Sequence, residues 1–141
     1  CIHKDYRNGA VITLLWRGII AYLTTSGSRW LFGMGSVKTV DPEELTAVYN
    51  SLVADGAVDL SFNVRALDDF KIDNFYERAK FVEHTDASRQ MVPALLRSYI
   101  RAGAVITGDP AIDLDFNCGD LFVILDVSKM SPTYNRKYQV N

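Results

Sequence analysis

Residues 3–16 read HKDYRNGAVITLLW, a polar run that ends at Asn8-Gly9 and gives way at once to helix-forming apolar residues. Gly9 can adopt backbone conformations that a residue with a Cβ avoids. The first N–H groups of the following helix have no partner inside that helix, and the helix dipole favours an anion beside them. Arg7 adds a planar, positively charged guanidinium. The stretch predicts a phosphate-binding turn, although Asn-Gly before a helix is also typical of a simple turn.

The composition is that of one soluble globular domain covering residues 1–141. Hydrophobic residues make up 48% of the 141 residues and charged residues 23%, and the net charge is −2. This balance does not favour broad nucleic-acid binding, so no nucleic-acid partner is expected. The two cysteines, Cys1 and Cys118, lack zinc or CxxC spacing and are predicted to be reduced, small core residues of an intracellular protein.

The N-terminal region raises two questions, about membranes and about what precedes the chain. No apolar run is expected to be long enough to cross a bilayer, since Arg17 interrupts the longest one, and no signal peptide is recognisable. The expected localisation is therefore cytoplasmic. The chain starts at Cys1 without Met, and Cys1-Ile2 is typical of the last part of a strand. We therefore expect that a preceding segment is missing.

The first half of the chain predicts a helix, a strand and a second helix. Apolar residues at helical spacing indicate a helix over 11–25, with Gly27 as its C-cap. The sequence WLFGMGSV at 30–37 reads as a buried strand, in which Gly33 and Gly35 indicate a bulge or a close backbone approach. Asp41 is predicted to cap a helix over 42–54, with Glu44 three residues later completing a capping box.

The segment from 55 to 86 is the least regular part of the sequence. Its five aromatic residues alternate with Arg and Lys, which can line an acyl tunnel or touch a membrane surface. A long loop folded over the core is the alternative that we favour. His84 lies in this polar segment and is expected to be solvated rather than to act as a base.

The last third predicts a helix opened by Pro93 and closed by Gly103, and then two strands. A strand is expected over 104–107, with a turn at 108–110. The apolar run 121–125 is expected to be a central strand covered on both faces. Between these strands stand five polar residues without metal-ligand spacing, so no metal site is predicted: Asp109, Asp113, Asp115, Asn117 and Asp120.

Two groups of motifs carry a resemblance to known families. YRNGAVITLLW resembles the acyl-donor loop of the GNAT superfamily of N-acyltransferases, except that Ala10 and Ile12 stand at the two later glycine positions. That departure suits a branch of the superfamily that loads long acyl chains, often from acyl carrier protein. The segments LLRSYIRAG, GDPAID and DFN, together with LFGMGS, resemble the ornithine-lipid N-acyltransferase family, whose members are also labelled haemolysins. This resemblance covers nearly the whole chain.

The resemblance implies a fold and an activity. The implied fold is α/β (α+β), a GNAT-like mixed sheet flanked by helices, of which this chain is the C-terminal portion; the alternation of strands and helices agrees with it. The implied reaction moves a long acyl group from a thioester to the α-amine of an amino acid such as ornithine or glycine. No permanently bound cofactor is implied. The phosphopantetheine of acyl-acyl carrier protein, or acyl-CoA, is the co-substrate. The implied partners are acyl carrier protein, the amino acid and a peripheral membrane contact.

The resemblance also assigns roles to residues. The Ile2 N–H would face the thioester carbonyl, and Tyr49 would protonate the departing thiolate, although a tyrosine on an amphipathic helix is more often a core residue. Asp109, Asp113 and Asp120 are candidates to orient the ammonium group or take its proton, and bonds to the local backbone are their alternative use. Two sets complete the assignment: a phosphate-binding set of Arg7, Asn8, Gly9, Ala10 and Val11, and a pantetheine slot beside Gly33 and Ser36.

Two other functions remain open at this point. The first is a non-catalytic module that binds lipid or a carrier protein. The second is an enzyme similar to acyl-homoserine-lactone synthases, which share the fold. No Ser-His-Asp or Cys-His arrangement is evident, so a covalent acyl-enzyme is not expected.

Overall fold

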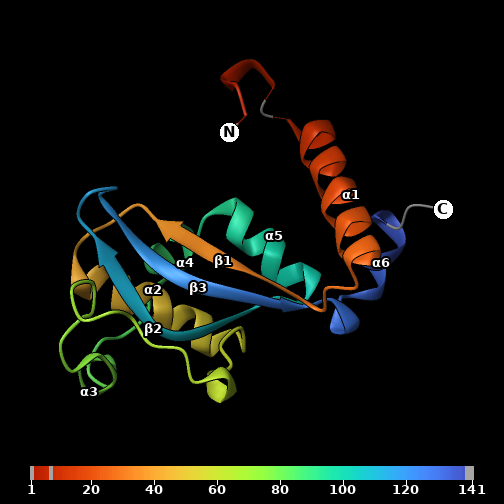
Figure 1. Ribbon diagram of the computed structural model, residues 1–141. Helices are drawn as coiled ribbons and strands as arrows, with labels where there is room; N and C mark the ends of the chain where they lie inside the picture. The colour runs from red at the N-terminus through yellow and green to blue at the C-terminus, as the bar shows by residue number, and fades with distance from the viewer. Residues whose placement is uncertain (1, 7, 139–141) are drawn as a thin grey trace.

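The computed structural model describes residues 2–6 and 8–138 (Figure 1). Three strands, six α-helices and three short 3₁₀ turns make up this part of the chain. In order they are η1 (Lys4–Tyr6), α1 (Gly9–Ser26), β1 (Trp30–Val37), α2 (Pro42–Ala54), η2 (Leu60–Phe62), α3 (Phe75–Ala79), α4 (Asp86–Met91), α5 (Ala94–Ala102), β2 (Val105–Asp113), β3 (Cys118–Asp126), η3 (Val127–Lys129) and α6 (Pro132–Tyr138).

The three strands form one sheet in the order β1-β3-β2, with both pairs antiparallel. Parallel pairing within the described residues is limited to an isolated bridge between Val58 and Ile106, where the segment after α2 runs along the free edge of β2. Hydrogen bonds from Ile106 N–H to Ala57 and from Asp59 N–H to Ile106 hold that segment in place. The α/β class with helices flanking the sheet is therefore confirmed.

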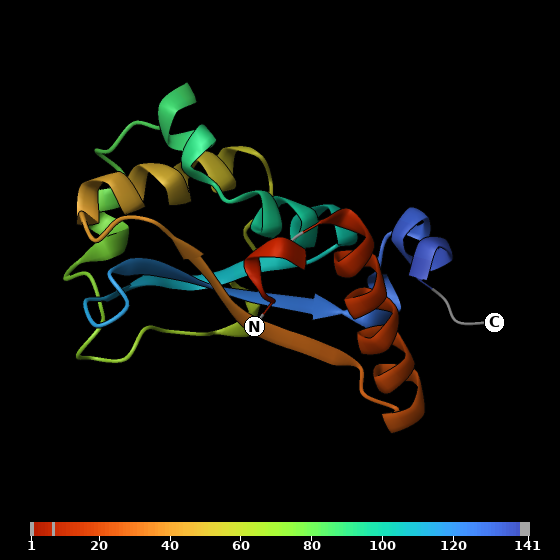
Figure 2. The ribbon, with the colours of Figure 1, turned by 90° about the horizontal axis from the view of Figure 1, so that it is seen from above.

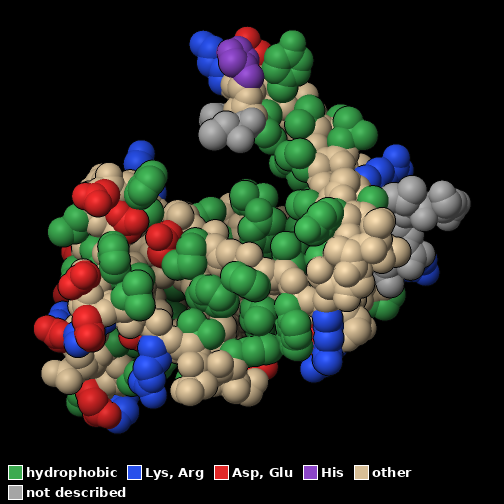
Figure 3. All heavy atoms as spheres, in the orientation of Figure 1, with side chains coloured by type: hydrophobic (Ala, Val, Ile, Leu, Met, Phe, Trp, Pro, Cys, Tyr) green, Lys and Arg blue, Asp and Glu red, His purple; other side chains and the backbone are tan. Residues whose placement is uncertain are grey.

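Helices α2, α4 and α5 cover one face of the sheet (Figures 1 and 2). Leu45 of α2, Leu96 of α5, and Ile106 and Leu121 of the sheet are fully buried between these layers. The packing is tight, because a Cβ on Gly119 of β3 would lie 2.5 Å from the Leu45 side chain. The opposite face is only partly covered, and hydrophobic side chains gather on it over β1 and β3 (Figure 3).

Helix α1 stands at the end of the sheet where β1 begins and β3 ends (Figures 1 and 2). Gly27 ends it in the left-handed conformation, with φ 66°, as the sequence predicts. Trp16, Ile20 and Leu23 are buried against the rest of the fold, whereas Leu14 and Tyr22 are exposed. The helix therefore carries a wider apolar surface than the described residues cover.

The expectation that no apolar run is long enough to cross a bilayer is wrong for α1. Its 18 residues have a mean hydropathy of 1.2, and by length and composition alone the helix could cross a membrane. Only 17% of it is buried. One such helix near the N-terminus is weak evidence for a span, because signal sequences and core helices can be equally long and apolar.

The turn expected at 108–110 is instead part of β2. The pairing of β2 with β3 shifts register between Thr107 and Ala111, and the extra residues form an irregularity inside one continuous strand. Gly108 adopts φ 77°, and Pro110 is tolerated because β2 lies at the sheet edge. The chain reverses later, between Asp113 and Cys118.

Two further expectations also need correction. The capping box on α2 does not form, because the Glu44 carboxylate accepts from Thr39 Oγ1, which itself receives the Asp41 N–H; the Asp41 cap itself is present. The central strand β3 is fully buried on one face only, since buried and half-buried residues alternate along it. Cys118 is half-buried at its start rather than in the core, and Cys1 lies outside the described residues.

Candidate functional site

An apolar cavity of about 790 Å³ opens between α1, β1 and α5. A volume of this size is typical of pockets that bind small organic ligands. Most of the lining is hydrophobic, and Ser98 and Tyr99 of α5 are its two residues with a side-chain hydroxyl. The full lining is Ile2, Ile12, Leu15, Trp16, Ile19, Leu31, Phe32, Gly33, Met34, Ala94, Leu95, Ser98, Tyr99, Ala104, Val123 and Leu125.

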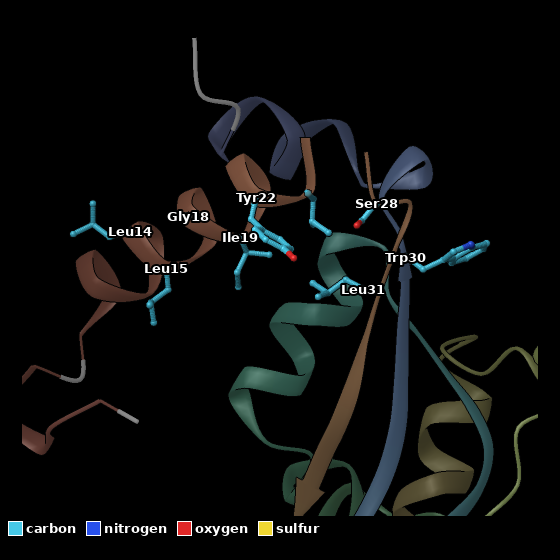
Figure 4. Close-up of a pocket in the computed structure, with 9 residues that line it drawn as sticks. Leu14, Leu15, Gly18, Ile19, Tyr22, Ser28, Trp30 and Leu31 are labelled. Carbon is cyan, nitrogen blue, oxygen red and sulfur yellow. The ribbon is translucent and has the colours of Figure 1, made fainter. Parts of the chain in front are cut away.

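A second apolar hollow of about 500 Å³ continues along α1 toward Ser28. Leu15, Ile19 and Leu31 line both spaces, so the two form one groove between the helix and the strand. Figure 4 shows Ile19, Tyr22 and Leu31 pointing into the space between α1 and β1. The groove can therefore hold an elongated apolar ligand.

The start of α1 differs from the open phosphate site expected from the sequence. The Asn8 side chain caps the helix, and its Oδ1 accepts from the N–H groups of Ala10 and Val11 at 3.1 Å each. These two N–H groups are therefore occupied, because an asparagine is itself a good helix cap. Gly9 opens the helix, and Arg7 lies outside the described residues.

The two slot residues predicted on β1 lie in different surroundings. Gly33 lines the cavity. Ser36 does not belong to the lining, and its Oγ donates a hydrogen bond of 2.6 Å to Asp120 Oδ1 on β3. The structure therefore brings Gly33 together with Ile2 at the cavity and leaves Ser36 beside the predicted carboxylates.

Each candidate aspartate accepts a hydrogen bond within the fold, and only the bond to Asp113 is local in sequence. Asp109 Oδ1 accepts from the Ala66 N–H at 3.1 Å, and Asp113 Oδ1 accepts from the Phe116 N–H in the turn between β2 and β3. Asp120 accepts from Ser36, and the half-buried thiol of Cys118 lies 3.7 Å from the same oxygen. None of these carboxylates lines the cavity, and Asp113 alone bonds the local backbone.

Tyr49 lies on the buried face of α2, where its ring packs edge-on against Phe75 at 4.9 Å. Only 3% of the residue is exposed, and its hydroxyl has no hydrogen-bond partner. Burial, with smaller contributions from Tyr76 and Asp109, raises the pKa of Tyr49 well above that of a free phenol. Tyr49 is not part of the cavity lining.

Sequence analysis missed Ser98 and Tyr99, the two residues of the cavity lining whose side chains carry a hydroxyl group. The Tyr99 ring packs edge-on against Trp16 of α1 at 5.7 Å, and burial raises the pKa of its phenol. The Ser98 and Tyr134 hydroxyls share a hydrogen bond of 3.1 Å. Leu95, Ser98 and Tyr99 stand at i, i+3 and i+4, so the helical spacing of α5 was the available signal for a shared face.

Metal and thiol chemistry have little support in this site. In residues 2–6 and 8–138, no three His, Cys, Asp or Glu side chains are grouped so that they could hold a metal ion. Burial and the neighbouring Asp120 carboxylate raise the pKa of the Cys118 thiol, which makes it a poor nucleophile. The described chain offers a shaped apolar groove rather than a reactive cluster.

Fold and groove together define an α/β domain that can bind an extended apolar chain. The sequence is similar to curated proteins named L-ornithine N(alpha)-acyltransferase: it is 28% identical to one from Rhizobium meliloti, 27% to one from Brucella abortus and 25% to one from Rhodobacter capsulatus. Each match covers 98% of this chain and 46%, 49% and 52% of the relative, respectively.

These matches confirm the resemblance to the ornithine-lipid N-acyltransferase family. The chain spans about half the length of the curated relatives it matches. No protein-family model and no solved structure matches it.

Proposed function

We propose that this chain forms the acyl-chain-binding part of an N-acyltransferase that acylates the α-amine of ornithine. The observation that carries this proposal is the agreement of two facts: the relatives that align with 98% of the chain bear that activity in their names, and the aligned region contains a long apolar groove. Acyl transfer to a polar amino acid requires such a groove for the other substrate.

The reaction joins the amine nitrogen to the acyl carbon and breaks the carbon–sulfur bond of the thioester. The amine loses one proton, and the departing thiolate gains one, so the products are an amide and a free thiol. The protein can accelerate these steps by positioning both substrates and by offering hydrogen-bond donors to the developing charges. The thioester belongs to acyl carrier protein or to coenzyme A, and we favour the carrier protein because Ala10 and Ile12 replace two glycines of the usual donor loop.

Two residues at the cavity are candidates to donate hydrogen bonds to the atoms that become negatively charged during the reaction. Ile2 lies in the lining, which supports the proposal that its N–H faces the thioester carbonyl. Tyr99 carries the only titratable side chain among the described lining residues. Its raised pKa keeps the phenol protonated, so it can donate a hydrogen bond to the departing sulfur. We assign this role to Tyr99 rather than to Tyr49, whose hydroxyl is buried elsewhere.

Binding of the donor phosphate at the start of α1 requires a local rearrangement. The Asn8 carboxamide has to turn away from Ala10 and Val11 so that their N–H groups can reach the phosphate. Gly9 allows this approach, because it carries no side chain and a Cβ there would meet nothing within 4 Å. Arg7 would contribute the cation that pairs with the phosphate.

A non-catalytic lipid-binding module is the second candidate. It is favoured by the scarcity of titratable groups in the described lining, where the predicted aspartates are absent. Under both proposals the protein is cytoplasmic. Peripheral contact with the membrane would use exposed apolar residues at the rim of the groove, among them Leu14 and Tyr22, which also line its second hollow.

One assay separates the two candidates. The full-length protein is incubated with long-chain acyl-acyl carrier protein and a panel of amino acids that includes ornithine and glycine, and release of free thiol is followed. We expect thiol release with ornithine and an N-acyl product of the matching mass. Binding of the acyl chain without turnover across the panel would instead establish the lipid-binding module.

A further inference from the structure

Neither the backbone conformation nor the packing at position 33 requires a glycine. Its φ lies outside the left-handed range that favours glycine, unlike Gly27, Gly56, Gly103 and Gly108. A Cβ built on Gly33 would meet nothing within 4 Å. Glycine weakens a strand relative to alanine, so a reason for its presence has to be found outside the fold.

At the neighbouring glycines of the sheet, by contrast, packing leaves no room for a side chain. A Cβ on Gly35 would lie 2.8 Å from Leu96 and 3.2 Å from Val123. Gly119 is tighter still, as described above. Both positions are filled by the core, whereas the space in front of Gly33 is empty.

The side chain that Gly33 lacks would point into the cavity. Residues two apart on a strand share a face, so Gly33 faces the same side as Leu31. Its direct partner on β3 is Val123, and Leu125 pairs with Leu31. All three of these neighbours line the cavity. The empty volume at Gly33 is therefore part of the groove between α1, β1 and α5.

We propose that the empty space at Gly33 sets the length of the acyl chain that the enzyme accepts. This inference rests on the proposed function, since it assigns the groove to the acyl group. This assigns Gly33 to the acyl chain rather than to the pantetheine slot predicted from the sequence. A side chain at position 33 would occupy volume that methylene groups of a long chain otherwise fill. The strand would tolerate a Cβ at this position, because that atom meets nothing within 4 Å.

The size of the effect follows from close packing. Leucine adds four carbon atoms relative to glycine, so Gly33→Leu shortens the longest chain that binds well by about four carbons. Each methylene group that loses its place in the groove weakens binding by about fourfold. Chains short enough to end before Gly33 keep their affinity.

The test uses the full-length protein and straight-chain fatty acids from eight to eighteen carbons, which displace a fluorescent fatty-acid probe. Gly33→Ala, Gly33→Val and Gly33→Leu form a graded series, and thermal melting confirms that each variant folds. The preferred length should fall stepwise with side-chain size, while the affinity for the shortest acids stays constant. Gly35→Ala is the matched control: it adds one methyl group two residues away on the same face, and it should lower the melting temperature without moving the preferred length.

The outcomes separate this inference from the proposed function. An unchanged length profile in Gly33→Leu, with normal binding by the wild type, would overturn the inference and leave the acyltransferase proposal standing. Equal weakening of all chain lengths would also overturn it, because it would show that Gly33 is needed for backbone approach. If the wild-type protein bound no fatty acid and released no thiol from acyl carrier protein, both proposals would fall.

Discussion

Ser36 and Asp120 are direct partners across the β1–β3 ladder, and the serine hydroxyl donates a hydrogen bond of 2.6 Å to the aspartate. This contact links the two strands near the end of β1, on the face away from the buried helix layer. The contact gives Asp120 a structural role, and this role accounts for a carboxylate at position 120 without a part in catalysis.

Ser36→Ala and Asp120→Asn should each lower the free energy of unfolding by about 1 kcal/mol, since each weakens the same hydrogen bond. Turnover should be retained in both variants. Urea denaturation of the two single variants and the double variant provides the measurement, with the double variant losing less than the sum. Loss of turnover in Asp120→Asn at unchanged stability would instead restore the catalytic role.

Tyr99→Phe should reduce kcat by about a hundredfold or more if the phenol donates to the departing sulfur. KM for the acyl donor should change little, because the ring that packs against Trp16 is retained. Steady-state kinetics with acyl-acyl carrier protein and ornithine tests this. An unaltered kcat would remove Tyr99 from the chemistry.

Tyr49→Phe is expected to behave in the opposite way. Its hydroxyl is buried without a hydrogen-bond partner, so removing it should leave the protein as stable or more stable by roughly 1 kcal/mol. Activity should persist, because the ring contact with Phe75 remains. A melting curve and the thiol-release assay on the same preparation decide the matter; an inactive but stable variant would support Tyr49 as the proton donor.

Asn8→Asp should raise KM for the acyl donor several-fold without lowering kcat. An aspartate also caps a helix, so α1 should keep its stability. Its negative charge, however, would stand where the donor phosphate is proposed to bind. Asn8→Ala serves as the neutral comparison, with a stability cost of about 1 kcal/mol. The same KM in all three proteins would show that the start of α1 does not contact the donor.

Stability at acid pH should depend on Asp126. The Arg29 guanidinium, 2.8 Å away, and the Ser128 hydroxyl hold the pKa of this carboxyl well below its usual range. The folded state therefore gains from the charged form, and this gain is complete above about pH 4, the usual aspartate pKa. It is lost as the pH falls below that value, because the unfolded chain takes up the proton first.

Asp126→Asn should accordingly flatten the fall in melting temperature between about pH 5 and pH 2. The slope should not vanish, because hydrogen bonds also lower the pKa of Asp59 and Asp68. Thermal melts across this range are the measurement. Identical acid profiles for the variant and the wild type would mean that the Arg29–Asp126 pair does not form in solution.

Local signals in the sequence predicted the elements well where one residue type dictates the backbone. Gly27 and Gly103 end helices in the left-handed conformation, and Asp41 caps α2 as expected. The strand over 30–37 has the predicted bounds. In these places short-range chemistry and tertiary packing favour the same conformation.

The differences between expectation and structure have both distant and local causes. Gly108 and Pro110 have turn chemistry, but pairing with β3 on one side and contacts with the segment after α2 on the other keep the strand continuous. Ala10 and Val11 were expected to offer free N–H groups, yet the preceding Asn8 satisfies them. The candidate aspartates were proposed because an amine substrate needs acidic partners, and that reasoning does not reveal that the cavity lies between α1 and α5.

Strand β1 pairs with β3 along one side only among the described residues, and it displays Trp30, Phe32 and Met34 as exposed side chains. An exposed edge strand of this kind can pair with a strand of another molecule. Strand β1 contains no lysine or proline, the residues that commonly prevent such self-association. Handling the isolated 141-residue polypeptide therefore carries a solubility risk, and additives that shield apolar surface should improve its recovery. If soluble yield changes with the length of the expressed polypeptide, the exposed edge of β1 is the first region to test for self-association.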